Sequence, residues 1–347
     1  MPELSVLTEQ LLAPVPGGTG RYTRELAAAL AATAPDGWSV TGVTARHADT
    51  AAAEVPGVRT RRLALPRRAL ALAWERGLPP RVGGASVHAP TPLSPDGAVV
   101  TVHDTVPYSH PETLTPRGVA WHRRMIGRAV HRAKAVVVPT RAVARDLSRR
   151  APGPVPVHVV GHGVTALPAP ADPDAVAARL GLPGEYVLAV GTVEPRKGID
   201  LLVPALASVG LPLVLAGAKG WGEVDVQALA ARHGVRVVGL GRISDEELAV
   251  ALRRAAALAA PSRAEGFGLP LLEAMAAGVP VAHSDDPALV EVAAGTGATH
   301  RRGDAEDLAR AIREAVRGER VADAAARAAE FTWTAAAERI WAVHLGG

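Results

Sequence analysis

The sequence predicts an α/β protein with two domains, each built on a parallel sheet, and three observations lead to this prediction. At 347 residues the chain is too long for one ordinary core and long enough for two domains of about 150 to 180 residues. In the second half, short and almost wholly apolar runs recur about every 22 to 26 residues, separated by segments with helical patterns. A segment rich in Pro and Gly, at 163–174, divides the halves.

The elements follow in order from these patterns. Apolar runs in the first half predict strands at 4–12, 38–45, 85–90, 98–104 and 134–140, with helices at 21–34 and 116–132. Runs in the second half predict strands at 186–191, 211–217, 235–241, 256–261 and 279–283. Ser244 and Glu247 have the spacing of a capping box, which predicts the start of a helix. Alternation of buried-type strands with helices is typical of βα units in a parallel sheet.

Several functional classes are excluded by what the sequence lacks. Without Cys, thiol catalysis, disulfides and the usual cysteine-based zinc sites are ruled out. There is no apolar run of about 18 residues or more, and the start at Pro2 and Glu3 does not resemble a signal peptide. We therefore expect a cytoplasmic protein.

The charge is uneven along the chain. Residues 1–165 hold 20 Arg and Lys against 11 Asp and Glu, a net charge of +9, whereas the remaining residues have a net charge of −5. The basic half favours an anionic partner, although an arginine-rich solvated surface is an equally good interpretation. With only three Tyr and two Phe and no recognition motif, we expect no nucleic-acid binding.

Two carboxylates flank a glycine-containing turn in the stretch PSRAEGFGLPLLEAMAAGVPV. Glu265 and Glu273 stand eight positions apart, and a short helix is predicted over 270–277. The free amides at the start of that helix favour an anion, and Gly266 and Gly268 allow a ligand to approach the backbone. Because carboxylates accept hydrogen bonds from hydroxyls, a nucleoside-diphosphate sugar suits this combination. Alternatively, Glu273 is an ordinary first-turn glutamate favoured by the helix dipole.

Three further segments carry candidate site residues. Arg196 and Lys197 follow the strand at 186–191, where two cations could neutralise a diphosphate, or could form a solvated pair. The glycines around Gly18 fall as GGxG rather than GxGxxG, so a phosphate cradle is favoured over a dinucleotide site. His103 and Asp104 end an apolar strand, which favours a site, although a lone His is more often structural.

Together these segments resemble the retaining glycosyltransferases of family 4. The resemblance covers almost the whole chain and is strongest at PSRAEGFGLPLLEAMAAGVPV and GTVEPRKG. It implies the GT-B architecture, with two Rossmann-like domains whose parallel sheets face each other across a cleft. The implied domains are an acceptor-binding domain at 1–165, a nucleotide-sugar-binding domain at 166–330, and a helix at 331–347 that crosses back to the first domain.

The resemblance also implies roles for individual residues. Glu273 is expected to bind the ribose hydroxyls and Glu265 the hydroxyls of the transferred sugar. Arg196 and Lys197 are expected to grip the diphosphate, with His103 near the transferred sugar. The remaining donor contacts implied are those of Gly18, Ile243, Gly268 and Leu269. One departure from the family is that Val290-Glu291 stands where a Pro-Glu pair is common.

As a mechanism, we expect the leaving diphosphate to accept the acceptor's proton on the same face of the sugar, while Arg196 and Lys197 stabilise its charge. No metal and no cofactor are expected. The literal DxD at 172–174 lies in the Pro-rich segment, where helix capping is the expected role of Asp172.

Several partners and activities remain open from the sequence. GDP-mannose is slightly favoured over UDP-sugars as donor, and the acceptor is a polysaccharide, glycolipid or secondary metabolite. A helix with Arg124, Arg128 and Arg132 at four-residue intervals could lie on an anionic surface, which would place the protein at the inner face of a membrane. The alternatives are a GT-B sugar-nucleotide epimerase and a catalytically degenerate binding subunit.

Overall fold

The computed structural model describes residues 1–220 and 224–346, and the chain divides into two compact units. Unit 1 comprises Met1–Gly163 together with Phe331–Gly347, and unit 2 comprises Val164–Glu330. The segment predicted as a linker, 163–174, contains the first division point. The chain thus leaves unit 1 once and returns to it near its end.

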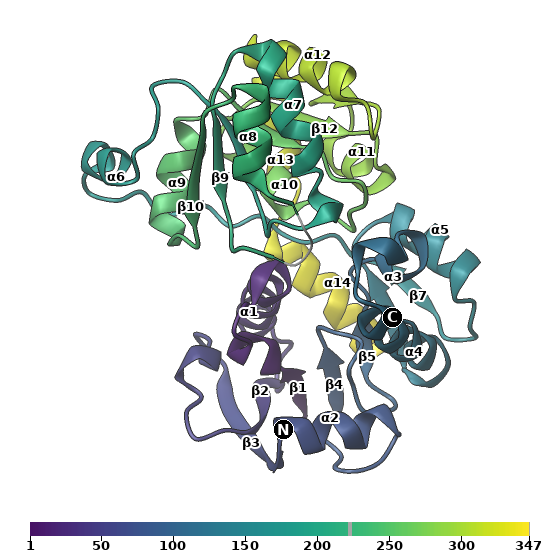
Figure 1. Cartoon of the computed structure of the whole chain (residues 1–347). Coiled ribbons are helices and arrows are strands. Elements are labelled where there is room, and N and C mark those ends of the chain that lie inside the picture. The colour runs from purple at the N-terminus through teal and green to yellow at the C-terminus, as the bar shows by residue number, and fades with distance from the viewer. Residues whose placement is uncertain (221–223, 347) are drawn as a thin grey trace. The chain divides into compact units, whose positions relative to one another are not determined.

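Unit 1 is built on a parallel sheet with the strand order β3-β2-β1-β4-β5-β6-β7 (Figure 1). This order makes β1 and β4 the neighbours between which the chain reverses its direction of strand addition, and ligands bind beyond the carboxyl ends of strands at such a point. The strands are β1 (Glu3–Leu7), β2 (Ser39–Arg46), β3 (Arg59–Pro66), β4 (Ser86–Ala89), β5 (Val99–Thr101), β6 (Ala135–Val138) and β7 (Val157–Val159). The α-helices are α1 (Gly17–Ala32), α2 (Arg67–Glu75), α3 (Val106–Ser109), α4 (Pro116–Arg132), α5 (Arg141–Arg150) and α14 (Trp333–Leu345).

The last helix, α14, completes the core of unit 1. It lies beside α1 (Figure 1), where Ile340 and Trp341 are buried among residues of α1 and β1. The indole N–H of Trp341 donates to the carbonyl of Leu30 at 3.1 Å. Because burial of apolar area stabilises a fold, α14 is part of the hydrophobic core of this unit.

Unit 2 is built on a second parallel sheet with the order β10-β9-β8-β11-β12-β13. Its reversal point lies between β8 and β11. The strands are β8 (Val187–Val190), β9 (Leu213–Ala216), β10 (Val237–Gly241), β11 (Ala257–Ala260), β12 (Val281–Ser284) and β13 (Ala298–His300). The α-helices are α6 (Pro173–Arg179), α7 (Ile199–Val209), α8 (Val226–His233), α9 (Asp245–Arg253), α10 (Leu269–Ala276), α11 (Pro287–Ala293), α12 (Ala305–Val316) and α13 (Val321–Ala329).

The predicted fold class is confirmed: both units are Rossmann-like α/β structures, and every predicted strand is present. Three details differ. Residues 9–12 form a 3₁₀ turn (Glu9–Leu12) rather than the end of a strand. Helix α1 begins at Gly17, four residues before the predicted start. The edge strands β3, β7 and β13 were not predicted: β3 begins with several arginines rather than with a continuous apolar run, and β7 and β13 have only three residues each.

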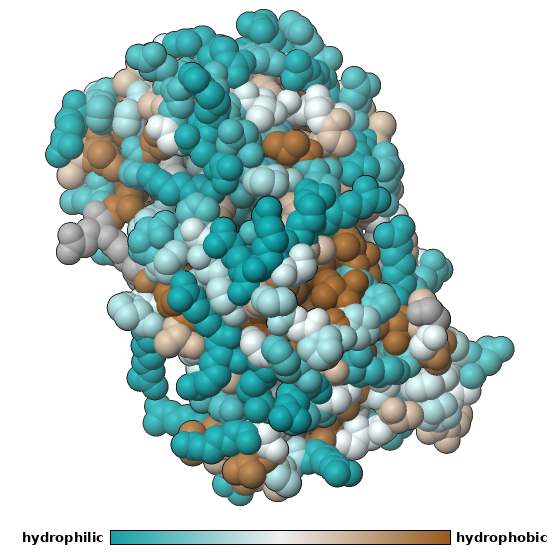
Figure 2. Space-filling view, turned by 90° about the vertical axis from the view of Figure 1, so that its right-hand side faces the viewer, coloured by the Kyte–Doolittle hydropathy of each residue, from teal (hydrophilic) through white to brown (hydrophobic). Residues whose placement is uncertain are grey.

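The surface is mixed in character. On the face drawn in Figure 2, hydrophobic residues form patches among hydrophilic ones. Among the described residues, no helix combines the length and the apolar character needed to cross a membrane.

Candidate active site

The sequence-predicted cations and the first glutamate meet at the reversal point of unit 2. Lys197 and Arg196 lie in the 3₁₀ turn Pro195–Lys197 after β8, and Glu265 lies in the loop after β11. Lys197 Nζ donates to Glu265 Oε1 at 2.5 Å, and Arg196 Nη1 donates to Oε2 at 3.0 Å. Ser262, which the sequence analysis missed, donates its hydroxyl to Oε1 at 2.7 Å. One carboxylate therefore holds both cations.

The protonation state of this cluster follows from its contacts. Burial alone would raise the pKa of Glu265, but the positive charges of Lys197 and Arg196 outweigh it and hold the pKa at about 2. Arg196 is also held by Glu194, at 2.7 Å. Glu265 is thus ionised, and it is tightly paired with both cations.

The loop from Glu265 leads directly into helix α10. Gly268 is the N-cap residue of that helix, with a φ of 92°, which favours glycine. A Cβ atom there would meet Leu289 Cδ2 at 2.4 Å. The helix starts at Leu269 rather than at Pro270, so Glu273 lies beyond its first turn, and the first-turn placement predicted from the sequence is wrong. Glu273 is buried, with 6% of its surface exposed.

Two other residues of unit 2 bear on this site. Ile243 follows β10, at the same edge of the sheet as Glu265, but β9 separates β10 from β8. Asp286, at the start of α11, accepts hydrogen bonds from the backbone amides of Ala288 and Leu289. Burial, together with the negative charge of Glu265, raises the pKa of Asp286 to about 6, against the lowering effect of its hydrogen bonds from backbone amides. Asp286 was not predicted as a site residue from the sequence, although two adjacent acids directly after a strand are a signal.

The departure at Val290-Glu291 has a structural explanation. Both residues lie within helix α11 (Pro287–Ala293), whose proline is at the first position instead. Pro is well suited to that position because its missing N–H would have no intrahelical partner there. The helix therefore forms without the Pro-Glu pair.

In unit 1, His103 lies directly beyond β5. Its Nε2 lies 2.8 Å from the carbonyl oxygen of Pro90. Since a carbonyl only accepts hydrogen bonds, Nε2 is protonated. Burial lowers the pKa of His103, so the ring is neutral and Nδ1 is an acceptor. The ring packs edge-on against Tyr22, with centroids 4.7 Å apart.

The glycines near Gly18 form the first turn of α1 rather than a separate loop. Gly17 is the first residue of the helix, and Gly18 follows it. The first four amides of a helix lack intrahelical acceptors, so the amide of Gly18 remains suited to an anion.

A pocket of about 510 Å³ opens in unit 1 at the carboxyl ends of β1, β4 and β5. His103 and Asp104 line it, together with Thr91, which follows β4, and Glu9, which follows β1. The pocket therefore lies at the reversal point of this sheet, where a ligand is expected.

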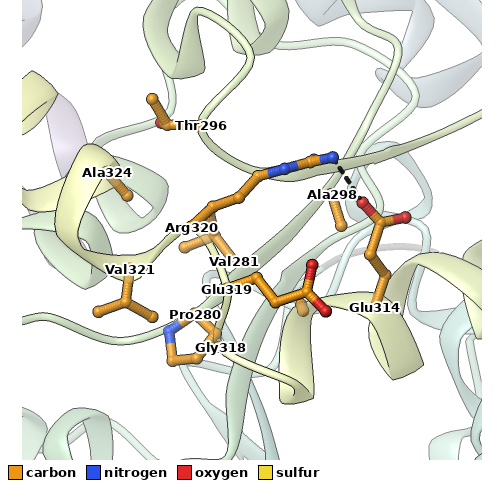
Figure 3. A pocket seen from close by; sticks show the side chains of 11 residues that line it. Pro280, Val281, Thr296, Ala298, Glu314, Gly318, Glu319, Arg320, Val321 and Ala324 are labelled. Carbon is orange, nitrogen blue, oxygen red and sulfur yellow. Dashed lines mark ion pairs between the residues drawn. The ribbon is translucent and has the colours of Figure 1, made fainter.

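A second hollow, in unit 2, lies at the opposite edge of its sheet. Figure 3 shows Val281 and Ala298 in its lining, with an ion pair between Arg320 and Glu314 at 3.0 Å. Val281 and Ala298 are the first residues of β12 and β13. Its volume of about 20 Å³ is enough for one water molecule, so it is not the site of a large ligand.

The literal DxD motif has structural partners. Asp172 is the N-cap of α6 and accepts from the amide of Ala175 at 2.9 Å, as predicted. Asp174 forms an ion pair with Arg254. Among the described residues, no group of three or more His, Cys, Asp or Glu side chains could hold a metal ion.

Comparison with protein families gives two matches that together span most of the chain. Residues 16–166 match Glycosyltransferase Family 4, and residues 175–331 match Glycosyl transferases group 1.

Curated relatives align with this chain over 33–46% of its length. O-antigen chain mannosyltransferase B of Escherichia coli is 35% identical over 162 residues, which are 43% of this chain and 42% of that protein. Lipopolysaccharide core biosynthesis mannosyltransferase LpcC of Rhizobium leguminosarum is 36% identical over 176 residues, or 46% and 49%. A D-inositol 3-phosphate glycosyltransferase of Segniliparus rotundus is 36% identical over 169 residues, or 45% and 38%. The match thus spans less than half the length of each relative.

Solved structures agree with the fold over the whole chain. Sucrose-phosphate synthase of Thermosynechococcus elongatus has a TM-score of 0.78 at 23% identity, covering 100% of this chain and 99% of that one. HepE of Anabaena in complex with UDP-glucose has a TM-score of 0.75 at 19% identity, covering 100% of both chains.

Proposed function

Since this chain belongs to family 4 of the glycosyltransferases, we propose that it is a retaining hexosyltransferase. It moves a hexose from a nucleoside-diphosphate sugar to a hydroxyl of a polysaccharide, glycolipid or secondary-metabolite acceptor. The observation that carries the proposal is the cluster at the end of β8, in which Lys197 and Arg196 both pair with Glu265. Two cations and a carboxylate suit the diphosphate and the sugar hydroxyls of such a donor.

We propose a role in the reaction for each group of the cluster. When a diphosphate enters, its oxygens take over hydrogen bonds of Lys197 and Arg196, and Glu265 accepts from sugar hydroxyls instead. As the bond from C1 of the sugar to the diphosphate breaks, negative charge grows on the leaving oxygen, and both cations stabilise it. That oxygen takes the proton of the acceptor hydroxyl as the new C1–O bond forms on the same face.

The two cations also support a reaction without a metal ion. Phosphoryl charge is commonly neutralised by Mg²⁺ or by Lys and Arg, and here both Lys197 and Arg196 are fixed at the site. We therefore propose that activity persists in EDTA.

Roles for the other candidate residues complete the proposal. Glu273 binds the ribose, the amides of Gly268 and Leu269 bind the sugar and phosphate, and Ile243 contacts the base through its backbone. From unit 1, the amide of Gly18 contacts the phosphate, and His103 accepts from a hydroxyl of the transferred sugar through Nδ1.

GDP-mannose is the favoured donor, because two of the relatives are named as mannosyltransferases. A UDP-sugar is the second candidate, since a protein of the same fold has been solved with UDP-glucose.

As the remaining part of the proposal, the protein contacts an anionic membrane surface at the cytoplasmic face. The arginines that support this contact differ from those named in the sequence analysis. Arg124 and Arg128 pair with Glu75 and Asp96, so they no longer require an outside anion. Exposed arginines from β3 to the loop after α2 instead have no acidic partner among the described residues, namely Arg59, Arg68, Arg76 and Arg81. Sedimentation with anionic against neutral vesicles tests this contact.

Turnover tests the proposed activity. GDP-mannose, UDP-glucose and UDP-galactose are each incubated with the protein and saccharide acceptors in EDTA, and products are identified by NMR. The proposal predicts a glycoside with the anomeric configuration of the donor. Interconversion of the donor sugar without transfer would identify an epimerase, and binding without any turnover would identify a degenerate subunit.

A further inference from the structure

The chemistry of the unit 1 pocket narrows the class of acceptor, and this inference rests on the proposed function. The volume of about 510 Å³ is in the range of small-molecule sites. Unit 1 alone supplies its lining, from the end of β1, from the segments that follow β1, β4 and β5, and from helices α1 to α4.

Carboxylates dominate the charged lining. Glu9, Glu75 and Asp104 line the pocket, against a single guanidinium, that of Arg67, among the described residues. Arg67 lies 3.5 Å from Glu9, and Arg124, which is not part of the lining, lies 2.6 Å from Glu75. Both guanidinium groups are thus already ion-paired, and none is left over for an incoming anion.

The two histidines of the lining add no positive charge at neutral pH. Burial lowers the pKa of His103 and that of His122, in each case against the raising effect of the nearby charge of Asp104. The pocket therefore has an excess of negative charge.

One carboxylate oxygen is placed to accept from a ligand. Asp104 Oδ1 accepts from the amide of Val106 at 3.0 Å, while no described residue forms a hydrogen bond or an ion pair with Oδ2. Asp104 follows His103 directly beyond β5, so Oδ2 is an acceptor at the carboxyl edge of the sheet.

Two tryptophans supply apolar surface. The indole N–H of Trp74 donates to the carbonyl of Pro80 at 3.0 Å, and that of Trp121 donates to Glu75 at 2.7 Å. With both N–H groups occupied, the rings offer only their apolar atoms to the pocket they line. Apolar rings beside hydrogen-bond acceptors suit a saccharide, which has C–H faces and hydroxyl edges.

We propose that this pocket binds an uncharged saccharide as the acceptor and discriminates against phosphorylated sugars, with Asp104 as the residue that determines this selectivity. A hydroxyl donates to Oδ2 of Asp104, whereas a phosphate meets like charge, and the described residues of the lining offer no unpaired cation to offset it. Repulsion of this kind suppresses binding of the wrong partner.

The test compares matched ligands by saturation-transfer NMR. The full chain is titrated with methyl α-D-mannopyranoside, methyl α-D-glucopyranoside and the 6-phosphate of each, with and without GDP or UDP. We expect at least one neutral glycoside to bind at least about tenfold more tightly than its phosphate.

Two variants distinguish the effect of charge in the pocket from the effect of the net charge of the protein. Asp104→Asn keeps Oδ1 as a cap for Val106 and removes one negative charge, so the preference for the neutral glycoside should fall. Asp96→Asn removes the same charge from a residue outside the pocket lining and should leave the preference unchanged.

Equal or tighter binding of the phosphates would overturn the inference, as would an equal effect of both variants. Absence of any glycoside binding while GDP or UDP still binds would also overturn it, but would leave the donor part of the proposed function standing. If no nucleotide binds either, the proposed function itself fails.

Discussion

Lys197 Nζ lies 2.5 Å from Oε1 of Glu265, and this ion pair joins the loops that follow the neighbouring strands β8 and β11. Both side chains are largely shielded, with exposed fractions of 18% and 11%. A buried charge needs a partner, and the positive charge of Lys197 helps to hold Glu265 in its ionised state. In the proposed reaction, the diphosphate replaces Glu265 as the partner of Lys197.

Replacement of Lys197 by Ala should lower kcat by about 10²–10³-fold, because one donor to the leaving diphosphate is lost. Steady-state kinetics with the donor identified by turnover measure this. Arg232→Ala is the matched control, because it removes an exposed cation from α8 without touching the cluster. Unchanged kcat in the Lys197 variant would remove this residue from the mechanism.

The low pKa of Glu265 predicts acid sensitivity. Its pKa in the folded state is about 2, below its ordinary value of 4.5, so its ionised form stabilises the fold. This contribution is present above about pH 4.5 and is lost as the pH falls towards 2. Its size is about 3 kcal/mol at 1.4 kcal/mol per pKa unit.

Denaturant unfolding of the wild type and of Glu265→Gln, from pH 7 to pH 2, checks this prediction. The glutamine side chain does not ionise, so the difference in stability between the two proteins should shrink as the pH falls. A difference that stays constant over this range would show that the ion pairs do not perturb Glu265.

Asp286 should show the opposite pH dependence. Its pKa in the folded state is raised to about 6 from 3.8, so the fold favours the protonated acid. That stabilisation is complete below about pH 4 and is lost as the pH rises through 6. Asp286→Asn keeps an oxygen to cap α11, so it should be at least as stable as the wild type at pH 8. The advantage should disappear at pH 4, and thermal unfolding at both values measures it.

Gly268→Ala should destabilise unit 2 more than Gly278→Ala. Both glycines have a positive φ, of 92° and 70°, so alanine is strained at either position. A Cβ at 268 would in addition meet Leu289 Cδ2 at 2.4 Å, whereas at 278 it would meet no atom within 4 Å. We expect losses of about 3 kcal/mol or more and about 1 kcal/mol, respectively. Equal losses in denaturant unfolding would contradict the packing seen at the start of α10.

Helix boundaries and caps that depend on neighbouring residues were the features most predictable from the sequence. Helix α4 runs over 116–132 as predicted, because Pro116 suits the first helical position and Thr115 caps the helix by accepting from the amide of Gly118. The capping box of Ser244 and Glu247 is also present. In each case, neighbouring residues determine the structure.

The candidate site and the pocket depend on contacts between residues that are distant in the sequence. Arg196 and Lys197 could have been a solvated pair, and only the adjacency of β8 and β11 brings them to Glu265. The pocket beside Asp104 is likewise formed by segments that follow three different strands. The spacing of residues within one segment does not predict such contacts between segments.

The most direct test of the central claim is thermal unfolding of the wild type and of Lys197→Ala with UDP, GDP, ADP and dTDP, each in magnesium and in EDTA. A diphosphate at 100 times its dissociation constant should add about 2.7 kcal/mol to the stability of the wild type. We predict that one diphosphate raises the unfolding midpoint of the wild type by several degrees in EDTA, and raises that of the variant much less. If no diphosphate stabilises the wild type, or if the variant responds equally, the cluster of Lys197, Arg196 and Glu265 is not a diphosphate site.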